Sequence, residues 1–160
     1  MDPEKRQFYW GNRGIRMRRL KKAFEHVRQF ALRYPQTRED HPWGESAIKV
    51  KGKTFVFMGV GEGRFGLSVK LPRSREFALE YPFTEPTRYG LGRSGWVSAS
   101  FAAKDDPPLD ILRAWVDESF RAVAPKKLVA ALPGDASASA DKSAASRRKR
   151  GAAARARRKQ

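Results

Sequence analysis

The chain has 160 residues, no cysteine, and 34 Lys and Arg against 17 Asp and Glu, which gives a formal net charge of +17. This length suits one domain with tails, and the lack of cysteine excludes a disulfide scaffold, a thiol nucleophile and cysteine-based metal sites. No stretch approaches the roughly 20 apolar residues of a membrane span, and no apolar run follows the basic N-terminus as in a secretory signal, so we expect a cytoplasmic protein that could associate with the nucleoid.

Most of the positive charge lies at the two ends of the chain. Residues 1–22 contain eight Lys and Arg against two acids, and residues 133–160 contain nine against two. Residues 23–132 contain 17 against 13. Such an excess favours an anionic partner, most commonly nucleic acid. The ends, more than the middle, therefore predict binding to a polyanion.

The first 16 residues combine aromatic and basic side chains. The aromatic triplet at residues 8–10 precedes several arginines, and Gly11 and Gly14 are expected to interrupt any helix. We expect a flexible extension. Stacking of the aromatic rings on nucleic-acid bases and packing of these rings onto the domain stay open as alternatives.

Hydrophobic periodicity predicts the elements of a folded domain over residues 17–132. Apolar residues at helical spacing predict a helix over residues 17–34, which Pro35 ends, followed by a loop over residues 37–44. Alternating patterns predict strands, the first two joined by a tight turn at Gly52-Lys53. In chain order, the remaining expected elements are strands at 47–51, 54–58 and 65–71, a short helix at 74–81, a strand at 96–101, a long helix at 108–123 and a short helix at 126–132.

This order of elements predicts the fold class. Sequential strands joined by tight turns form an antiparallel sheet, and the long N- and C-terminal helices would cover one face of it. We therefore expect a two-layer α+β sandwich. Residues 133–160 contain no aromatic residue, Leu, Ile or Val, so they cannot bury enough apolar area to fold and are predicted to form a disordered basic tail.

The candidate motifs for catalysis, cofactor binding and metal binding lack the sequence context that these sites require. Residues 61–66 match G-x-G-x-x-G, but they link two predicted strands and not a strand to a helix, so a hairpin turn explains them better. His26 and His41 are the only histidines, and three metal ligands cannot be assembled around either. Ser94 lacks the nucleophile-elbow pattern. We expect no enzyme activity, no cofactor and no metal.

Basic residues carry the main functional signal. Lys49, Lys51 and Lys53 alternate along the first predicted hairpin and are expected to project from one face. The basic runs in the tail would bind phosphates without reading sequence. Trp43, Tyr89 and Trp96 could line a groove, although core packing is the default for such tryptophans. The candidate nucleic-acid-binding residues are Arg16, Arg18, Arg19, Lys21, Lys22, Lys49, Lys51, Lys53, Lys70, Arg147, Arg148, Lys149, Arg150, Arg155, Arg157, Arg158 and Lys159.

The central residues resemble the MmcQ/YjbR family. The resemblance rests on residues 40–45 (DHPWGE), 49–55 (KVKGKTF), 67–70 (LSVK) and 89–97, and on Ser119-Phe120, where the family usually has Ser-Tyr. It covers about residues 20–125 and implies a small α+β fold similar to the bacterial frataxin homologue CyaY. Members are described as DNA-binding proteins with a double-wing motif. The frataxin-like relation also raises iron binding, which the basic first helix disfavours.

Two functions of different classes follow. The leading one is a monomeric, non-enzymatic nucleic-acid-binding protein that contacts phosphates without sequence preference, with DNA favoured over RNA. The alternative is a module that binds a protein or a small ligand, with the basic ends ancillary. Whether the folded domain itself contacts nucleic acid stays open at this point.

Overall fold

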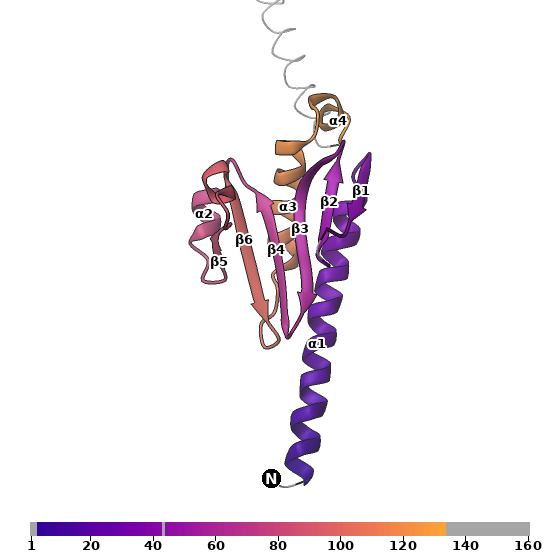
Figure 1. The fold of residues 1–160 in the computed structure, drawn as a ribbon, viewed down its shortest axis with the longest axis vertical. Helices are drawn as coiled ribbons and strands as arrows, with labels where there is room; N and C mark the ends of the chain where they lie inside the picture. The colour runs from indigo at the N-terminus through magenta and orange to yellow at the C-terminus, as the bar shows by residue number, and fades with distance from the viewer. Residues whose placement is uncertain (1–2, 43, 134–160) are drawn as a thin grey trace, which may run out of the picture. The chain divides into compact units, whose positions relative to one another are not determined.

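The computed structural model describes residues 3–42 and 44–133, with side chains from residue 14 onward. In this part of the chain, six strands form one antiparallel sheet with the order β1-β2-β3-β4-β6-β5 (Figure 1). The elements are α1 (Pro3–Leu32), β1 (Thr37–Asp40), β2 (Ser46–Val50), β3 (Lys53–Gly61), β4 (Arg64–Lys70), α2 (Arg75–Leu79), β5 (Thr84–Pro86), the 3-10 helix η1 (Leu91–Ser94), β6 (Trp96–Ala102), α3 (Leu109–Val123) and α4 (Lys126–Ala130).

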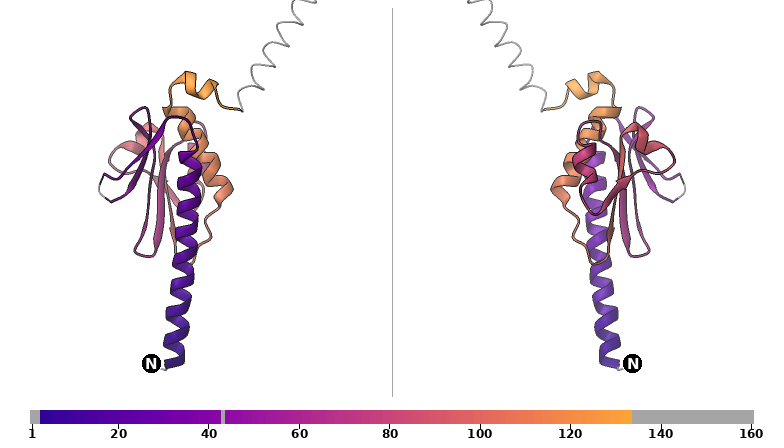
Figure 2. Two further views of the ribbon diagram at one scale, coloured as in Figure 1. Left: turned by 90° about the vertical axis from the view of Figure 1, so that its right-hand side faces the viewer. Right: turned by 90° about the vertical axis from the view of Figure 1, so that its left-hand side faces the viewer.

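Helices α1 and α3 pack against the same face of the sheet and leave the opposite face open (Figure 2). Aromatic contacts join the two layers: Phe24 of α1 meets Phe65 of β4 with ring centroids 6.0 Å apart, and Phe120 of α3 meets Phe55 of β3 at 5.3 Å. Burying these side chains supplies the main driving force for folding. The expected two-layer α+β sandwich is confirmed. The largest fully buried side chains are Phe55, Phe65, Phe101, Phe120, Leu20, Ile48, Met58, Leu71, Leu112, Val27, Val50 and Val56.

Helix α1 is longer than its amphipathic section. It begins at Pro3, so the expectation that Gly11 and Gly14 interrupt the helix is wrong. Each glycine costs a helix about 1 kcal/mol relative to alanine, and the surrounding Lys, Arg and Gln residues are good helix formers that offset part of this cost. The first fully buried side chain of α1 is that of Leu20 among those described, and α1 extends past the sheet (Figure 1).

Two short edge strands were not expected from the sequence. Residues 37–40, predicted as loop, form β1 and pair with β2, and residues 84–86 form β5 and pair with β6. Neither segment shows apolar alternation: each is only three or four residues long, and an edge strand buries little of its surface. Pairing with a neighbouring strand therefore determines their conformation more than local propensity does.

A bulge lies in β3, next to the first hairpin. Ile48 pairs with Val56 and Lys49 with Thr54, so Phe55 has no direct partner on β2. Both Phe55 and Val56 are buried as a result, where strict alternation would bury one of them. The bulge thus adds an aromatic ring to the core beneath α3.

Helix α4 belongs to a second unit of the chain, which begins at Pro125 and is described by itself. The carbonyl of Pro125 accepts hydrogen bonds from the amides of Leu128 and Val129 at 2.9 and 3.2 Å. None of the helices formed by the described residues is long and apolar enough to cross a membrane.

Candidate nucleic-acid interface

The open face of the sheet, opposite α1 and α3, has a floor of small side chains. Directly paired residues share a face, and Gly59 pairs with Gly66, which in turn pairs with Ser100. Ser68 pairs with Phe57 on one side and with Ser98 on the other. Because the residues between them turn their apolar side chains to the helices, the centre of this face presents glycines, serines and one phenylalanine.

Three hydroxyl groups are linked across the open face. The oxygens of Ser68 and Ser98 lie 2.6 Å apart, and that of Thr87 lies 2.9 Å from Ser98. Three hydroxyls carry three protons, and two hydrogen bonds use two of them. One proton is left to donate, because the described residues supply these hydroxyls with no further acceptor.

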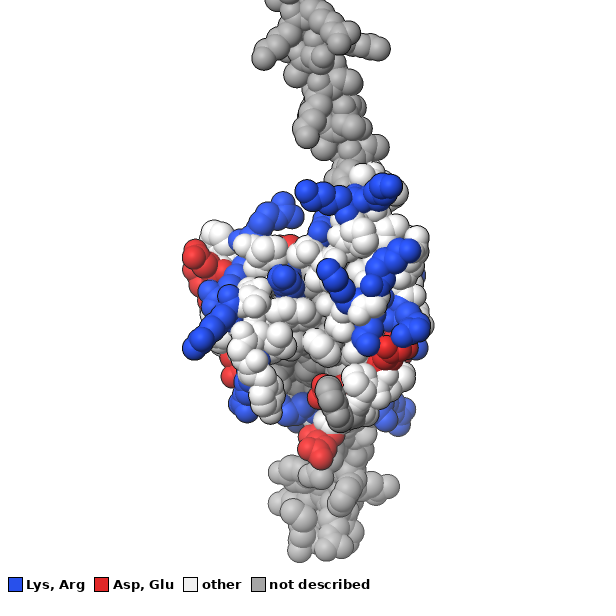
Figure 3. Space-filling view, turned by 45° about the horizontal axis from the view of Figure 1, so that its top comes forward, with Lys and Arg blue, Asp and Glu red and all other residues white. Residues whose placement is uncertain are grey.

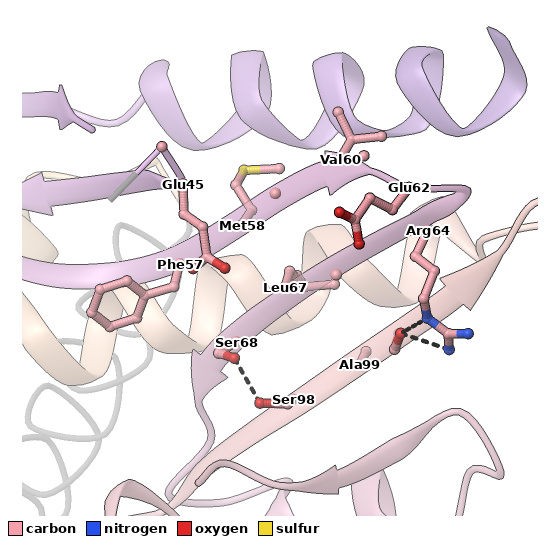
Figure 4. A pocket seen from close by; sticks show the side chains of 15 residues that line it. Glu45, Phe57, Met58, Val60, Glu62, Arg64, Leu67, Ser68, Ser98 and Ala99 are labelled. Atoms are coloured by element: carbon pink, nitrogen blue, oxygen red, sulfur yellow. Dashed lines mark hydrogen bonds between the residues drawn. The ribbon is translucent and has the colours of Figure 1, made fainter. Parts of the chain in front are cut away.

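Two adjoining hollows, of about 480 and 360 Å³, lie on the open face. Both are lined by Glu45, Phe57, Ser68 and Ser98, so they form one continuous depression. Figure 4 shows the side chains that line the larger hollow. The paired glycines leave room in the floor: a Cβ on Gly66 would meet its nearest atom at 3.7 Å. The depression therefore lies where side chains are missing from the centre of the sheet.

Aromatic rings border the depression. The ring centroids of Phe57 and Trp96 lie 5.6 Å apart, and Trp96 is only 7% exposed. Tyr89 lines the smaller hollow with its side chain 99% exposed, and its φ of 57° is in the left-handed region that non-glycine residues rarely adopt. Of the three predicted groove residues, Tyr89 lines the depression, Trp96 contacts it through Phe57, and Trp43 lies outside the described residues.

Cations collect at one end of the sheet, where β2 and β4 end and β3 begins. We call this group the basic end. Figure 3, in which this end of the sheet is turned toward the viewer, shows Lys and Arg side chains around an uncharged central area. In this region a hydrogen bond of 2.8 Å from the amide of Leu71 to the carbonyl of Gly95 joins the segment after β4 to the segment before β6. The residues of the basic end are Lys51, Lys53, Lys70, Arg73 and Arg93, all exposed except the half-buried Lys70.

The three hairpin lysines do not project from one face, contrary to the sequence-based expectation. The turn is formed by Lys51 and Gly52, both with positive φ, and not by Gly52 and Lys53. Lys53 therefore pairs with Val50, on the side of the helices, whereas Lys49 points to the open face. Lys49 is also neutralised in part, because its Nζ lies 2.8 Å from a carboxylate oxygen of Asp40.

Helix α1 carries a second basic surface, which we call the α1 stretch. Arg16, Arg18, Arg19, Lys21 and Lys22 are all exposed, and none forms an ion pair with a described acid. The same helix turns Leu20, Ala23 and Val27 into the core, so the cations occupy the remaining sides of the helix. The predicted tail residues, Arg147, Arg148, Lys149, Arg150, Arg155, Arg157, Arg158 and Lys159, lie outside the described residues.

The perturbed acids serve the packing of helices on the sheet. Hydrogen bonds from Arg28 lower the pKa of the Glu39 carboxyl against the effect of its burial, and Ser46 adds a further bond. Burial raises the pKa of the Glu118 carboxyl, but bonds from Ser74 and the amide of Arg73 outweigh it and keep that pKa below the ordinary value. These groups stabilise element junctions and lie outside the depression.

Sequence reasoning missed the hydroxyl chain. Its signal is present, since small residues occupy alternate positions at 66 and 68 and again at 98, 100 and 102. Only the register aligns Ser68 with Ser98 and brings Thr87 beside them. Among the described residues, no group of three His, Asp or Glu side chains could hold a metal ion.

No curated protein matches the chain in sequence. The family model described as YjbR matches residues 32–122, which include the whole sheet from β1 to β6 and most of α3. This match covers more than half of the chain and agrees with the resemblance in residues 40–45 and 119–120. The chain therefore belongs to the YjbR family.

Proposed function

We propose that the protein binds nucleic acid without catalysis, mainly through contacts to phosphates and without sequence preference, with DNA favoured over RNA. The observation that carries this proposal is the α1 stretch. Five cations within seven residues stand exposed on one helix, and no described acid pairs with them. Holding so many like charges together is unfavourable unless a polyanion neutralises them.

The rest of the charge distribution agrees with this proposal. The basic end adds cations at one end of the sheet, and the tail adds nine Lys and Arg within residues 133–160. Lysines and arginines spread over several surfaces suit a long polyanion better than a compact anionic metabolite. Their contacts would release counterions, which makes the affinity fall steeply with salt.

The proposal is tested by titrating the full chain with duplex DNA, and with RNA of the same sequence, from about 50 to about 200 mM salt. We expect log K to fall linearly with log salt, with a steep slope, and to change little when the DNA sequence is scrambled. Absence of binding at the lowest salt, or a flat salt dependence, would contradict the proposal.

A second candidate function follows from the depression of the open face. Hollows of about 480 and 360 Å³ are large enough for a small ligand or a short peptide segment. In this function the domain would be a ligand- or protein-binding module with ancillary basic ends. It predicts binding that is insensitive to salt and does not require the α1 stretch.

A further inference from the structure

We propose that the depression on the open face binds an unpaired base, so that the preferred partner is single-stranded nucleic acid. This inference rests on the proposed function and adds a site and a substrate class to it. The α1 stretch and the tail would supply affinity for any polyanion. The depression would distinguish a strand whose bases are accessible from a duplex.

The walls of the depression suit a planar ring. Phe57 and Tyr89 present aromatic surfaces, and Leu91 and Pro42 add apolar contacts at the smaller hollow. Every base has a π-face, so stacking on such rings is tolerant of sequence. Tyr89 is nearly fully exposed on a backbone of unfavourable φ, which places a large ring at the rim without any packing in return.

The floor suits the polar edge of a base. The Ser68–Ser98–Thr87 chain has one proton to donate and oxygen lone pairs to accept. Glu45 lines both hollows, and its Cγ lies 3.6 Å from where a Cβ on Gly59 would be, so its stem lies over the floor. A carboxylate accepts hydrogen bonds from an exocyclic amino group, which favours bases that carry one.

Other classes of ligand fit the depression less well. A free phosphate would meet the carboxylates of Glu45 and Glu85, and Arg88, the cation that lines the smaller hollow, already lies 3.9 Å from a carboxylate oxygen of Glu85. A lipid chain would bury the remaining proton of the hydroxyl chain without an acceptor, which is unfavourable for a polar group. A base in a duplex has its edge paired and its faces stacked, so it cannot enter.

Cations stand where the phosphates of a bound strand would pass. Arg64 begins β4 and Lys70 ends it, on the same face and about 20 Å apart at 3.4 Å per residue. Gly66 and Ser68, the floor of the depression, lie between them. Arg64 is oriented along the face by hydrogen bonds of 3.1 and 3.0 Å to the hydroxyl of Ser100 (Figure 4). A floor of glycine, serine and phenylalanine side chains with a cation at each end of β4 is complementary to bases on an anionic backbone.

The test compares the full chain with two variants against labelled single-stranded DNA of about 12 nucleotides and its duplex. Tyr89→Ala removes the exposed ring. Gly66→Val fills the floor of the depression. The backbone at residue 66 is extended, and a Cβ there would make only ordinary van der Waals contacts, so the variant is expected to fold. Phe77→Ala is the matched control, since Phe77 is another exposed aromatic residue, 72% exposed, that lines neither hollow.

We expect the wild type to prefer the single strand. Tyr89→Ala and Gly66→Val should weaken single-strand binding roughly fivefold to a hundredfold, the range of one lost base stack, with little effect on the duplex. Phe77→Ala should behave as wild type. Oligo-dC should bind more tightly than oligo-dT. Gly66→Ala, a smaller filling, provides an intermediate effect if Gly66→Val is unstable.

Each other outcome overturns a defined part of the argument. Equal affinity for single strand and duplex, with both variants unaffected, overturns the base site and leaves the proposed function standing. If neither single-stranded nor duplex DNA binds at low salt, the proposed function itself is contradicted. Tight binding of a short arginine-containing peptide that Gly66→Val abolishes, with DNA binding unchanged, would assign the depression to a protein partner and overturn the inference.

Discussion

The hydroxyl of Ser119 donates a buried hydrogen bond of 2.5 Å to the carbonyl oxygen of Phe55. The same oxygen atom of Ser119 accepts a bond of 2.8 Å from the amide of Lys70. Phe55 is the bulged residue of β3, and direct pairing of β3 with β4 ends at Val56 and Val69. A side chain of α3 thus replaces the missing rung between the two strands.

Replacing Ser119 with alanine is therefore expected to destabilise the domain. The change leaves a carbonyl and an amide without their partner in the interior, which costs about 1–3 kcal/mol per unsatisfied group. Urea denaturation followed by circular dichroism measures the loss. Ser94→Ala, at an exposed serine of η1, is the control, and equal midpoints for the two variants would show that water or a backbone shift satisfies both groups.

The carboxylate of Glu118 should make stability depend on acid. Its pKa in the folded state lies below the ordinary value of 4.5, so its contribution is present above about pH 4.5 and is lost as the pH falls through the folded pKa. Glu118→Gln should be less stable at pH 7 and lose less further stability between pH 5 and pH 3 than wild type does. Urea midpoints across this pH range measure the loss of stability, with Glu76→Gln, at an exposed glutamate, as the control. If the midpoints of wild type and Glu118→Gln fall in parallel with pH, the carboxylate of Glu118 is not the source of the acid dependence.

The α1 stretch should contribute directly to the salt dependence of DNA binding. Arg18→Gln with Lys22→Gln removes two exposed cations one helical turn apart, opposite the buried side of α1. The slope of log K against log salt should become shallower by about 1–2. The matched pair is Lys104→Gln with Arg113→Gln, of which Arg113 is already paired with Asp110. An equal change in both double variants would indicate a general effect of net charge and no contact by α1.

The tail is expected to contribute a separate part of the affinity. Removing residues 134–160 deletes nine Lys and Arg and two acids, so affinity for duplex DNA should fall and the salt slope should flatten. A full-length variant in which the same nine residues are glutamine separates charge from length. If the truncated chain binds as tightly as the full chain at every salt concentration, the tail has no such role.

The elements that the sequence predicted well are those with strong local periodicity. The alternation in residues 65–71 and the helical spacing in residues 109–123 correspond to β4 and α3, because one buried face imposes a period of 2 or 3.6 on the residues. β1 and β5 lack such a period, since their hydrogen bonds to a neighbour, and not a buried face, hold them in place. Helix α1 was predicted too short because its first turns carry no apolar stripe.

By itself the sequence determined the fold class, the family and the strong excess of positive charge, because composition and periodicity are local properties of the chain. Tertiary structure alone decided which of these charges lie together. The turn at Lys51 and Gly52 and the bulge at Phe55 set the register of β2 and β3, and a shift of one residue moves a side chain to the other face. For this reason Lys49 and Lys53 lie on opposite faces, and the paired glycines and linked serines form a depression that no stretch of sequence displays.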